Sequence, residues 1–152
     1  FPLREHTDLE ESTIQIMMKM KLDLVGLSGF DTFKPAQLSG GMKKRVGLAR
    51  AIIMDPKYIL YDEPTTGLDP IMAANIDKLI VELSEKLNVT SIVVTHDMQS
   101  VAKVADRVVM LHLGKIIFSG TVSELYATEN RAVAQFVNAD AEGPIQPKPT
   151  LY

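Results

Sequence analysis

In the first third of the chain, apolar residues recur at the three- and four-residue spacing of a helix face. Over residues 7–20 this spacing predicts an amphipathic helix. Its apolar stripe consists of Ile14, Met17 and Met18. Turn-forming residues dominate positions 28–37, so a loop is expected there. A second helical pattern follows the loop and stops at Asp55-Pro56, because proline cannot continue a helix.

An uninterrupted apolar run at residues 58–61 predicts a strand, and residues 91–95, with Ile92, Val93 and Val94 at their centre, predict a second buried strand. A run without polar alternation is typical of a strand that is buried on both faces of a parallel sheet. Between the runs, Asp69 is placed to cap a helix with Pro70 at its first position. The apolar stripe of that helix consists of Ile76, Leu79, Ile80, Leu83 and Leu87. Strand, helix and strand together predict one right-handed βαβ unit and an α/β fold.

The last third of the chain has the pattern of a hairpin followed by helices. Residues 107–113 and 115–119 alternate around Gly114, which predicts two strands joined by a tight turn. Helices are expected from about Thr121 and over residues 130–137.

Composition narrows the class of protein. The 152 residues are 46% hydrophobic, which is enough for one domain with a core. Sixteen basic and nineteen acidic residues give a net charge of −3, which argues against nucleic-acid binding. The absence of cysteine excludes disulfides and thiolate metal sites. No apolar run approaches the ~20 residues that span a bilayer, so no direct membrane insertion is expected. A start at Phe1, without initiator methionine or signal region, indicates a cut inside a longer protein or processing.

Polar residues with catalytic potential follow both predicted strands. Asp62-Glu63 ends the first strand and His96-Asp97 follows the second. Ligands of parallel α/β sheets bind at the carboxyl ends of the strands. The desolvation of two acids after four apolar residues is usually offset by a metal, a partner or a substrate. Taken alone, the acids are equally consistent with a solvated pair at a strand end.

The segment Leu38-Ser39-Gly40-Gly41-Met42 opens the second predicted helix. Ser39 is a natural N-cap, and two glycines leave room for another molecule to approach the backbone. The free N–H groups and positive dipole end of such a helix favour an anion such as phosphate. Without further motifs, a flexible loop that carries a good cap would be the better interpretation of this segment.

Three ordered motifs decide between these alternatives. Ser39-Gly40-Gly41, the run DEPTTGLDP at residues 62–70, and Thr95-His96-Asp97 resemble the ABC ATPase family in order and spacing. The similarity extends over about residues 22–120. It implies a P-loop NTPase fold of the α/β class, here incomplete, with part of the helical subdomain and the second half of the parallel-sheet core. It also implies ATP and Mg²⁺ as cofactors.

The resemblance implies a role in dimer contacts for four residues. Ser39, Gly40 and Gly41 would form the signature loop, which touches the γ-phosphate of ATP held on a partner subunit. Asp69 would lie in the loop that crosses the interface of the dimer.

The resemblance also implies a catalytic group at the strand ends. Asp62 would be the Walker B acid that holds Mg²⁺, usually through water. Glu63 would be the general base or water-orienting residue, and His96 the switch histidine that reads the γ-phosphate. Phosphoryl transfer depends on positioning, charge neutralisation and an aligned water, and these residue types suit it.

The four residues after the signature glycines, Met42 to Arg45, include one departure from the family pattern and three basic residues. Met42 stands where the family most often has Gln, and it has no donor for a ribose or base contact. Lys43-Lys44-Arg45 could pass for a small nucleic-acid patch, but on the first turns of a helix it is interpreted as a solvated face.

The sequence contains no Gly-x-x-x-x-Gly-Lys-[Ser/Thr] phosphate loop. The resemblance places that loop before Phe1, so this polypeptide alone is expected to be inactive even though its parent would be an ATPase. Residues 1–50 are assigned to a partial helical subdomain with the signature, and residues 51–138 to the second half of the nucleotide-binding core. Residues 139–152, which hold three prolines, are expected to form an extended tail.

Shorter motifs resemble one group within the family, the ATPase subunits of bacterial lipid-asymmetry (Mla) and mammalian-cell-entry (Mce) transporters. These motifs are Phe1-Pro2-Leu3-Arg4-Glu5, the run KLDLVGL at residues 21–27, Met42-Lys43-Lys44-Arg45 and Gly143-Pro144-Ile145. The resemblance implies a homodimer that drives an integral membrane permease and moves phospholipid between membranes. Such a subunit would lie at the cytoplasmic face of the bacterial inner membrane.

Other functions remain open from the sequence. An ABC ATPase for another cargo would carry the same motifs, and a translation factor would carry a second cassette. A DNA-repair or chromosome-maintenance ATPase would show zinc cysteines or long heptads, and this sequence has neither. A chain without a phosphate loop is also consistent with a non-catalytic interaction fragment.

Overall fold

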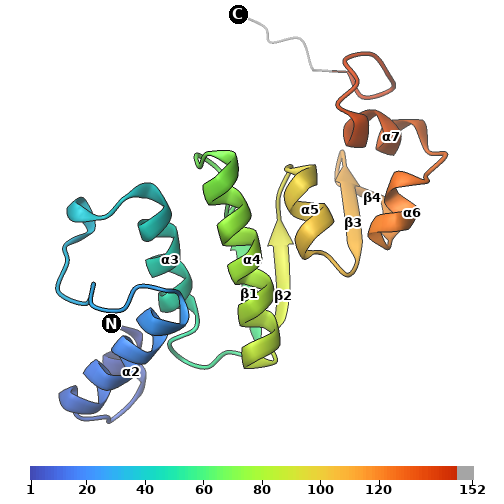
Figure 1. The fold of residues 1–152 in the computed structure, drawn as a ribbon. Helices are drawn as coiled ribbons and strands as arrows, with labels where there is room; N and C mark the ends of the chain where they lie inside the picture. The colour runs from blue at the N-terminus through green and yellow to red at the C-terminus, as the bar shows by residue number, and fades with distance from the viewer. Residues whose placement is uncertain (147–152) are drawn as a thin grey trace, which may run out of the picture. The chain divides into compact units, whose positions relative to one another are not determined.

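The computed structural model describes residues 1–146, and the chain divides into two compact units, Phe1–His96 and Asp97–Tyr152 (Figure 1). The first unit contains α1 (Pro2–His6), α2 (Glu11–Leu24), the 3₁₀ turn η1 (Pro35–Gln37), α3 (Gly40–Ala51), β1 (Tyr58–Asp62), α4 (Pro70–Leu87) and β2 (Thr90–Val94).

The helix predicted over residues 7–20 is present as α2, but its bounds are shifted to Glu11–Leu24, and a separate short helix, α1, precedes it. Thr7 has extended backbone, and its N–H and hydroxyl both donate to the carbonyl of Leu3, which closes α1. The next helix begins only at Glu11. Of the predicted stripe, Ile14 is buried and Met17 packs beside it, whereas Met18 is exposed.

The end of α2 lies beyond the predicted boundary at residue 20, because Leu22 packs into the core. Gly26, with a φ of 71°, reverses the chain after the helix. Its N–H donates to the carbonyl of Asp23 at 2.9 Å, and that of Leu27 donates to Leu22 at 2.8 Å. This pair of bonds is a Schellman motif, which satisfies carbonyls that the helix end leaves without partners.

The predicted βαβ unit is present, with β1 and β2 paired in parallel from Tyr58 opposite Thr90 to Asp62 opposite Val94. The helix between them, α4, starts as predicted, with Asp69 as its N-cap and Pro70 at its first position. Figure 1 shows α4 lying along the two strands. The βαβ unit shares one hydrophobic core with α2 and α3, which consists of Leu22, Val25, Leu27, Leu48, Ala49, Ile52, Ile59, Tyr61, Ile76, Leu79, Ile80, Leu83 and Val89.

Burial of the sheet on both faces, expected from the uninterrupted apolar runs, is wrong for the described residues. Along β1, Ile59 and Tyr61 are buried, but Leu60 is 76% exposed. On β2, Ile92 and Val94 are likewise exposed. Successive side chains of a strand point to opposite faces, and the helices of this unit pack on only one of them. The other face of the sheet is therefore an open apolar surface.

The second unit contains α5 (Met98–Val104), β3 (Val108–His112), β4 (Lys115–Gly120), α6 (Val122–Tyr126) and α7 (Arg131–Asn138). The predicted hairpin is formed by β3 and β4, which pair antiparallel. Leu113 and Gly114 make its two-residue turn, and both have positive φ, as in the turns that match strand twist. The two predicted helices are α6 and α7, capped by Thr121 and Asn130.

The sequence interpretation missed α5. Its signal was Asp97, whose carboxylate accepts hydrogen bonds from the N–H groups of Gln99 and Ser100 at 2.9 and 3.4 Å. A carboxylate two and three residues before such N–H groups is a standard N-cap.

The predicted extended tail is corrected for residues 140–145, which fold back onto α7. The buried side chain of Gln135 donates to the carbonyls of Asp140 and Ile145 and accepts from the N–H of Ile145. A buried amide with three backbone partners fixes this loop, because leaving those groups unpaired would cost free energy. Residues 147–152, with two of the three prolines, lie outside the described part of the chain.

Candidate functional site

The parallel register brings the ends of the two strands to one edge of the sheet. Asp62 is the last residue of β1 and lies opposite Val94, the last residue of β2. The N–H of Glu63 donates to the carbonyl of Val94 at 2.9 Å, so the pairing continues one residue beyond the strand. Glu63 and His96 therefore leave the sheet next to each other, as their sequence positions predict.

The backbone of Glu63 adopts a conformation that is unfavourable for a residue with a side chain. Its φ is 46°, in the left-handed region, which costs a non-glycine residue roughly 1–2 kcal/mol. The carbonyl of Glu63 accepts hydrogen bonds from the N–H of Thr66 at 3.3 Å and from Nζ of Lys44 at 3.2 Å. Together with the bond to Val94, these contacts hold the conformation in place.

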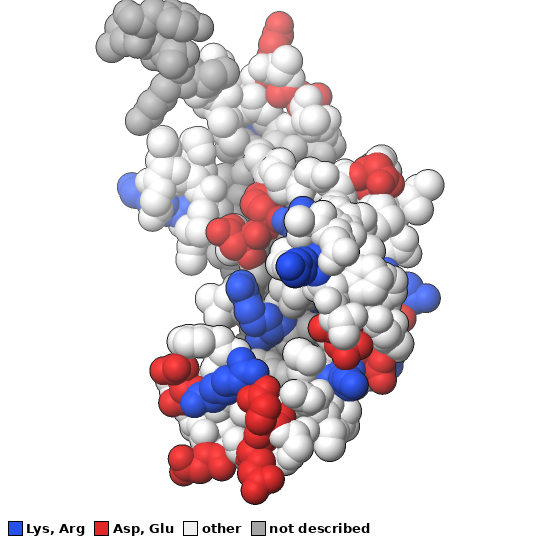
Figure 2. Space-filling model, turned by 90° about the vertical axis from the view of Figure 1, so that its left-hand side faces the viewer, with Lys and Arg blue, Asp and Glu red and all other residues white. Residues whose placement is uncertain are grey.

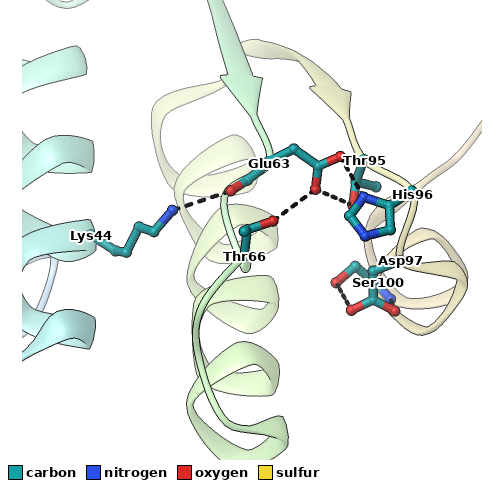
Figure 3. A network of polar contacts seen from close by, with 7 residues as sticks. All are labelled: Lys44, Glu63, Thr66, Thr95, His96, Asp97 and Ser100. Atoms are coloured by element: carbon teal, nitrogen blue, oxygen red, sulfur yellow. Dashed lines mark hydrogen bonds and ion pairs between the residues drawn. The ribbon is translucent and has the colours of Figure 1, made fainter. Parts of the chain in front are cut away.

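The carboxylate of Glu63 is held by three side chains of the same unit (Figure 3). Its Oε1 lies 2.7 Å from Nδ1 of His96. Its Oε2 accepts from the hydroxyls of Thr66 at 3.0 Å and Thr95 at 3.5 Å.

The hydrogen bond from His96 lowers the pKa of the Glu63 carboxyl, and the bond from Thr66 adds to this effect. Partial desolvation acts in the opposite direction but is weaker. Glu63 is therefore ionised at neutral pH. An ionised, oriented carboxylate is suited to align a water molecule and to accept a proton from it as that water attacks.

Asp62 differs from its neighbour in having no partner. Its side chain is exposed and makes no hydrogen bond or ion pair with any residue that the structure describes. Residues 1–146 contain no group of three or more His, Cys, Asp or Glu side chains arranged to hold a metal ion. The site thus offers Mg²⁺ one free carboxylate. That fits an ion that usually takes one or two carboxylates and completes its shell with water and substrate phosphate.

The signature residues stand at the N-terminus of α3. Ser39 is the N-cap, and its Oγ accepts from the N–H of Met42 at 3.3 Å. The same hydroxyl keeps its own proton for donation to an anion. Gly40 is exposed, but Gly41 is buried, and a Cβ on Gly41 would lie 2.2 Å from Cε of Met72 in α4. Gly40 is therefore the glycine that leaves backbone accessible, whereas Gly41 allows the two helices to approach.

Asp69 caps α4 close to this loop. Its Oδ1 accepts from the N–H groups of Ile71 and Met72, both at 3.0 Å. A Cβ on Gly40 would lie 3.8 Å from the side chain of Leu68, one residue before the cap. The N-termini of α3 and α4 are therefore neighbours, and the structure brings the signature residues and Asp69 together.

Sequence reasoning missed the roles of three residues that hold Glu63. Thr66 and Thr95 belong to the recognised motifs, and their signal was their place just beyond a strand end. Lys44 was interpreted as part of a solvated face, which is wrong, because it bonds Glu63. Arg45 is also engaged, since it donates to the carbonyl of Val25 at 2.9 Å. Of the three basic residues after the signature, only Lys43 is exposed, whereas Lys44 and Arg45 are half-buried.

The surface of the first unit carries both charges. Figure 2 shows basic and acidic side chains interspersed on the face it draws. Ion pairs in this unit include Arg4–Glu11, Lys19–Asp31 and Lys21–Asp55. In the described part of the chain, no helix combines the length and the apolar character that crossing a bilayer requires.

Comparison with known proteins confirms the fold class that the motifs predict. Residues 3–66 match the family described as "ABC transporter". A solved structure, cbiO1 from Clostridium perfringens, part of the ABC transporter complex cbiONQ, superposes with a TM-score of 0.75. It is 33% identical in sequence, and the match covers 91% of this chain and 54% of that one. The chain therefore has part of the ABC ATPase fold, which is a P-loop NTPase fold.

The predicted resemblance to the Mla group of ATP-binding subunits is also confirmed. The intermembrane phospholipid transport system ATP-binding protein MlaF of Haemophilus influenzae is 45% identical over 146 residues, which are 96% of this chain and 55% of that protein. The probable ribonucleotide transport ATP-binding protein mkl of Mycobacterium tuberculosis is 41% identical, over 95% of this chain and 40% of that protein. The chain thus spans about half the length of the relatives it matches, or less.

Proposed function

We propose that the protein containing this chain is the ATP-hydrolysing subunit of an ABC transporter that moves phospholipid between bacterial membranes. In this proposal two copies form a dimer on a membrane permease at the cytoplasmic face of the inner membrane. The observation that carries the proposal is the group at the strand ends, where ionised Glu63 is fixed by His96 at 2.7 Å beside the unpartnered carboxylate of Asp62.

The residues of this chain divide the work of hydrolysis. Bound Mg²⁺ would neutralise charge on the phosphates of ATP, and Asp62 would hold the ion through one carboxylate. Glu63 would orient water and accept its proton, while His96 holds the carboxylate in place. Ser39 and Gly40 would present a hydroxyl and free N–H groups to ATP on the second subunit, because the N-terminus of α3 favours an anion.

The phospholipid cargo rests on the printed function of the MlaF relative, which is 45% identical to this chain. The mkl relative, at 41%, names ribonucleotide as a competing cargo. Reconstitution with the cognate permease tests the choice. We expect phospholipid, and not ribonucleotide, to stimulate ATP hydrolysis and to move between membranes.

The catalytic assignment is tested in the full-length protein with Glu63→Gln and Ser39→Arg. We expect Glu63→Gln to lower the turnover number by about 10²–10⁴-fold, the usual contribution of a general base. ATP should still clamp two such subunits together, because the variant keeps its shape. Ser39→Arg should bind ATP as a monomer but fail to dimerise. Phosphate release and size-exclusion chromatography with ATP and Mg²⁺ measure the two steps.

Glu85→Gln is the matched control, since Glu85 is an exposed residue of α4 and the same charge is removed there. It should hydrolyse ATP like the unmodified protein. Normal turnover in Glu63→Gln, or normal ATP-dependent dimerisation in Ser39→Arg, would show that the assigned roles are wrong.

A further inference from the structure

Lys44 joins the signature helix to the main chain of the proposed catalytic residue. It lies in the second turn of α3, five residues after the Ser39 cap, and its ammonium group donates to the carbonyl of Glu63 at 3.2 Å. Figure 3 shows the side chain reaching from α3 to the Glu63 backbone, while the Glu63 carboxylate points away from it, toward His96. Lys44 therefore contacts the backbone of Glu63 and leaves its carboxylate free for chemistry.

We propose that Lys44 is a positioning residue, which fixes the backbone of Glu63 and thereby links the placement of the signature loop to hydrolysis. This inference rests on the function proposed above, in which Glu63 is the base. The contact acts on a strained position, because a φ of 46° is unfavourable for glutamate. A charged donor on the carbonyl stabilises that conformation more than a neutral donor does.

The contact comes from an anchored helix. Arg45, the next residue, donates to the carbonyl of Val25 at 2.9 Å and so holds α3 against the end of α2. Gly26 provides the space, since a Cβ there would lie 2.8 Å from Nη1 of Arg45. Lys44 and Arg45 thus tie α3 to the backbone of two other segments, at Glu63 and at Val25. A helix held in this way moves as one body, and Lys44 moves with Ser39.

A link between the N-terminus of α3 and the backbone of Glu63 has a consequence for a dimer. The N-terminus of α3 would meet ATP held by the partner subunit, whereas Glu63 would act on the ATP of its own subunit. When the signature loop docks on the ATP of the partner subunit, Lys44 would favour the observed backbone conformation of Glu63, which acts on the ATP of its own subunit. Such a coupling acts in both directions. It would keep Glu63 fully active only when the dimer is closed.

The test compares Lys44→Met, Lys44→Arg and Lys43→Met in the full-length protein. Methionine has about the length of lysine but no donor, and arginine restores the donor. Lys43 is exposed on the same helix, and its side chain makes no hydrogen bond or ion pair with the described residues, so Lys43→Met removes the same charge without the bond. Turnover number, KM for ATP and ATP-dependent dimerisation are measured for each.

For Lys44→Met we expect about a tenfold lower turnover number, the effect of one hydrogen bond from a charged group. The KM and the ATP-dependent dimer should stay as in the unmodified protein, because Lys44 touches neither the nucleotide nor the partner. Lys44→Arg should recover most of the turnover, and Lys43→Met should lose none. A structural role alone would not give this split between turnover and KM, nor the recovery.

The proposal is overturned if Lys44→Met turns over normally, if Lys43→Met loses as much, or if Lys44→Arg recovers nothing. Should Lys44→Met not fold, we expect Lys44→Gln, which keeps only a neutral donor, to have a lower turnover number than the unmodified protein. Equal turnover in Lys44→Gln and the unmodified protein would then count against a charged contact. The Glu63→Gln variant separates the two hypotheses. If it hydrolyses ATP, the proposed function fails, whereas inactive Glu63→Gln with normal Lys44→Met refutes only the role of Lys44.

Discussion

The two halves of the candidate site differ in how completely they are built from the first unit's own residues. At the strand ends, both oxygens of the Glu63 carboxylate have partners, and its backbone carbonyl has two more. At the N-terminus of α3, Ser39 makes one cap bond of 3.3 Å and Gly40 is exposed. One half is organised in advance, and the other leaves donors for something outside this unit.

The cap of the neighbouring helix α4 shows that an open N-terminus is specific to α3. Asp69 places a carboxylate on the N-terminus of α4 and accepts two bonds of 3.0 Å. That negative charge occupies the positive end of the helix dipole, whereas Ser39 leaves the end of α3 uncompensated. An anion is therefore expected to bind at α3 and to be repelled at α4. The predictions that follow test this contrast between a closed, catalytic half and an open, docking half.

The largest expected effect concerns hydrolysis by the 152-residue polypeptide alone. A preorganised base is not sufficient for phosphoryl transfer, because a phosphate loop supplies most of the contacts that hold the phosphates. We expect no Mg²⁺-dependent phosphate release above that of its Glu63→Gln variant. A polypeptide in which a phosphate loop precedes these residues should hydrolyse ATP under the same conditions. Robust turnover by the polypeptide that Glu63→Gln abolishes would mean that the closed half works by itself.

A smaller effect is expected from the two helix caps. Asp69→Ala removes two short bonds and a favourable charge, so the free energy of unfolding should fall by about 1 kcal/mol. Ser39→Ala removes one long bond and should cost about 0.5 kcal/mol or less. Urea denaturation of the polypeptide measures both. A larger loss for Ser39→Ala would show that its cap is as firmly built as that of α4, and the contrast would disappear.

Local signals in the sequence were sufficient to predict the start of α4 and the proximity of Glu63 to His96. The Asp69-Pro70 pair fixes the start of α4 because both residues act within a few positions of themselves. The neighbourhood of Glu63 and His96 follows from parallel strands, whose carboxyl ends meet at one edge. The Schellman ending at Gly26 was equally local, yet it was missed because the helical pattern before it was interpreted as ending at residue 20.

Other features depend on contacts between distant segments, and the sequence pattern could not show them. Lys44 and Glu63 are 19 residues apart, and nothing about a lysine after a glycine pair distinguishes a bonded side chain from a solvated one. The packing of Gly41 against Met72 is likewise visible only once α3 and α4 are side by side. The apolar run at residues 58–61 predicted a strand correctly, but it could not tell which of its faces this chain covers.

The smallest expected effect is a change in the pKa of Glu63 when His96 is replaced by alanine. In the native structure the hydrogen bond from His96 holds this pKa below its ordinary value. Removing the imidazole should therefore raise it toward that value, while the bond from Thr66 keeps part of the depression. Carbon-13 NMR titration of the Glu63 carboxyl in the 152-residue polypeptide measures the change.

The sign of the accompanying stability effect follows from linkage between protonation and folding. A carboxyl whose pKa is lower in the folded state binds fewer protons there, so it stabilises the fold above its ordinary pKa. That contribution is lost as the pH falls through the depressed value. His96→Ala should thus be less stable than the unmodified polypeptide near neutral pH, and the difference should shrink in acid. Glu63 is one-third exposed, so solvent screening keeps the effect small. An unchanged pKa would mean that the imidazole does not hold the base, and that the closed half owes its order to the threonines and the backbone.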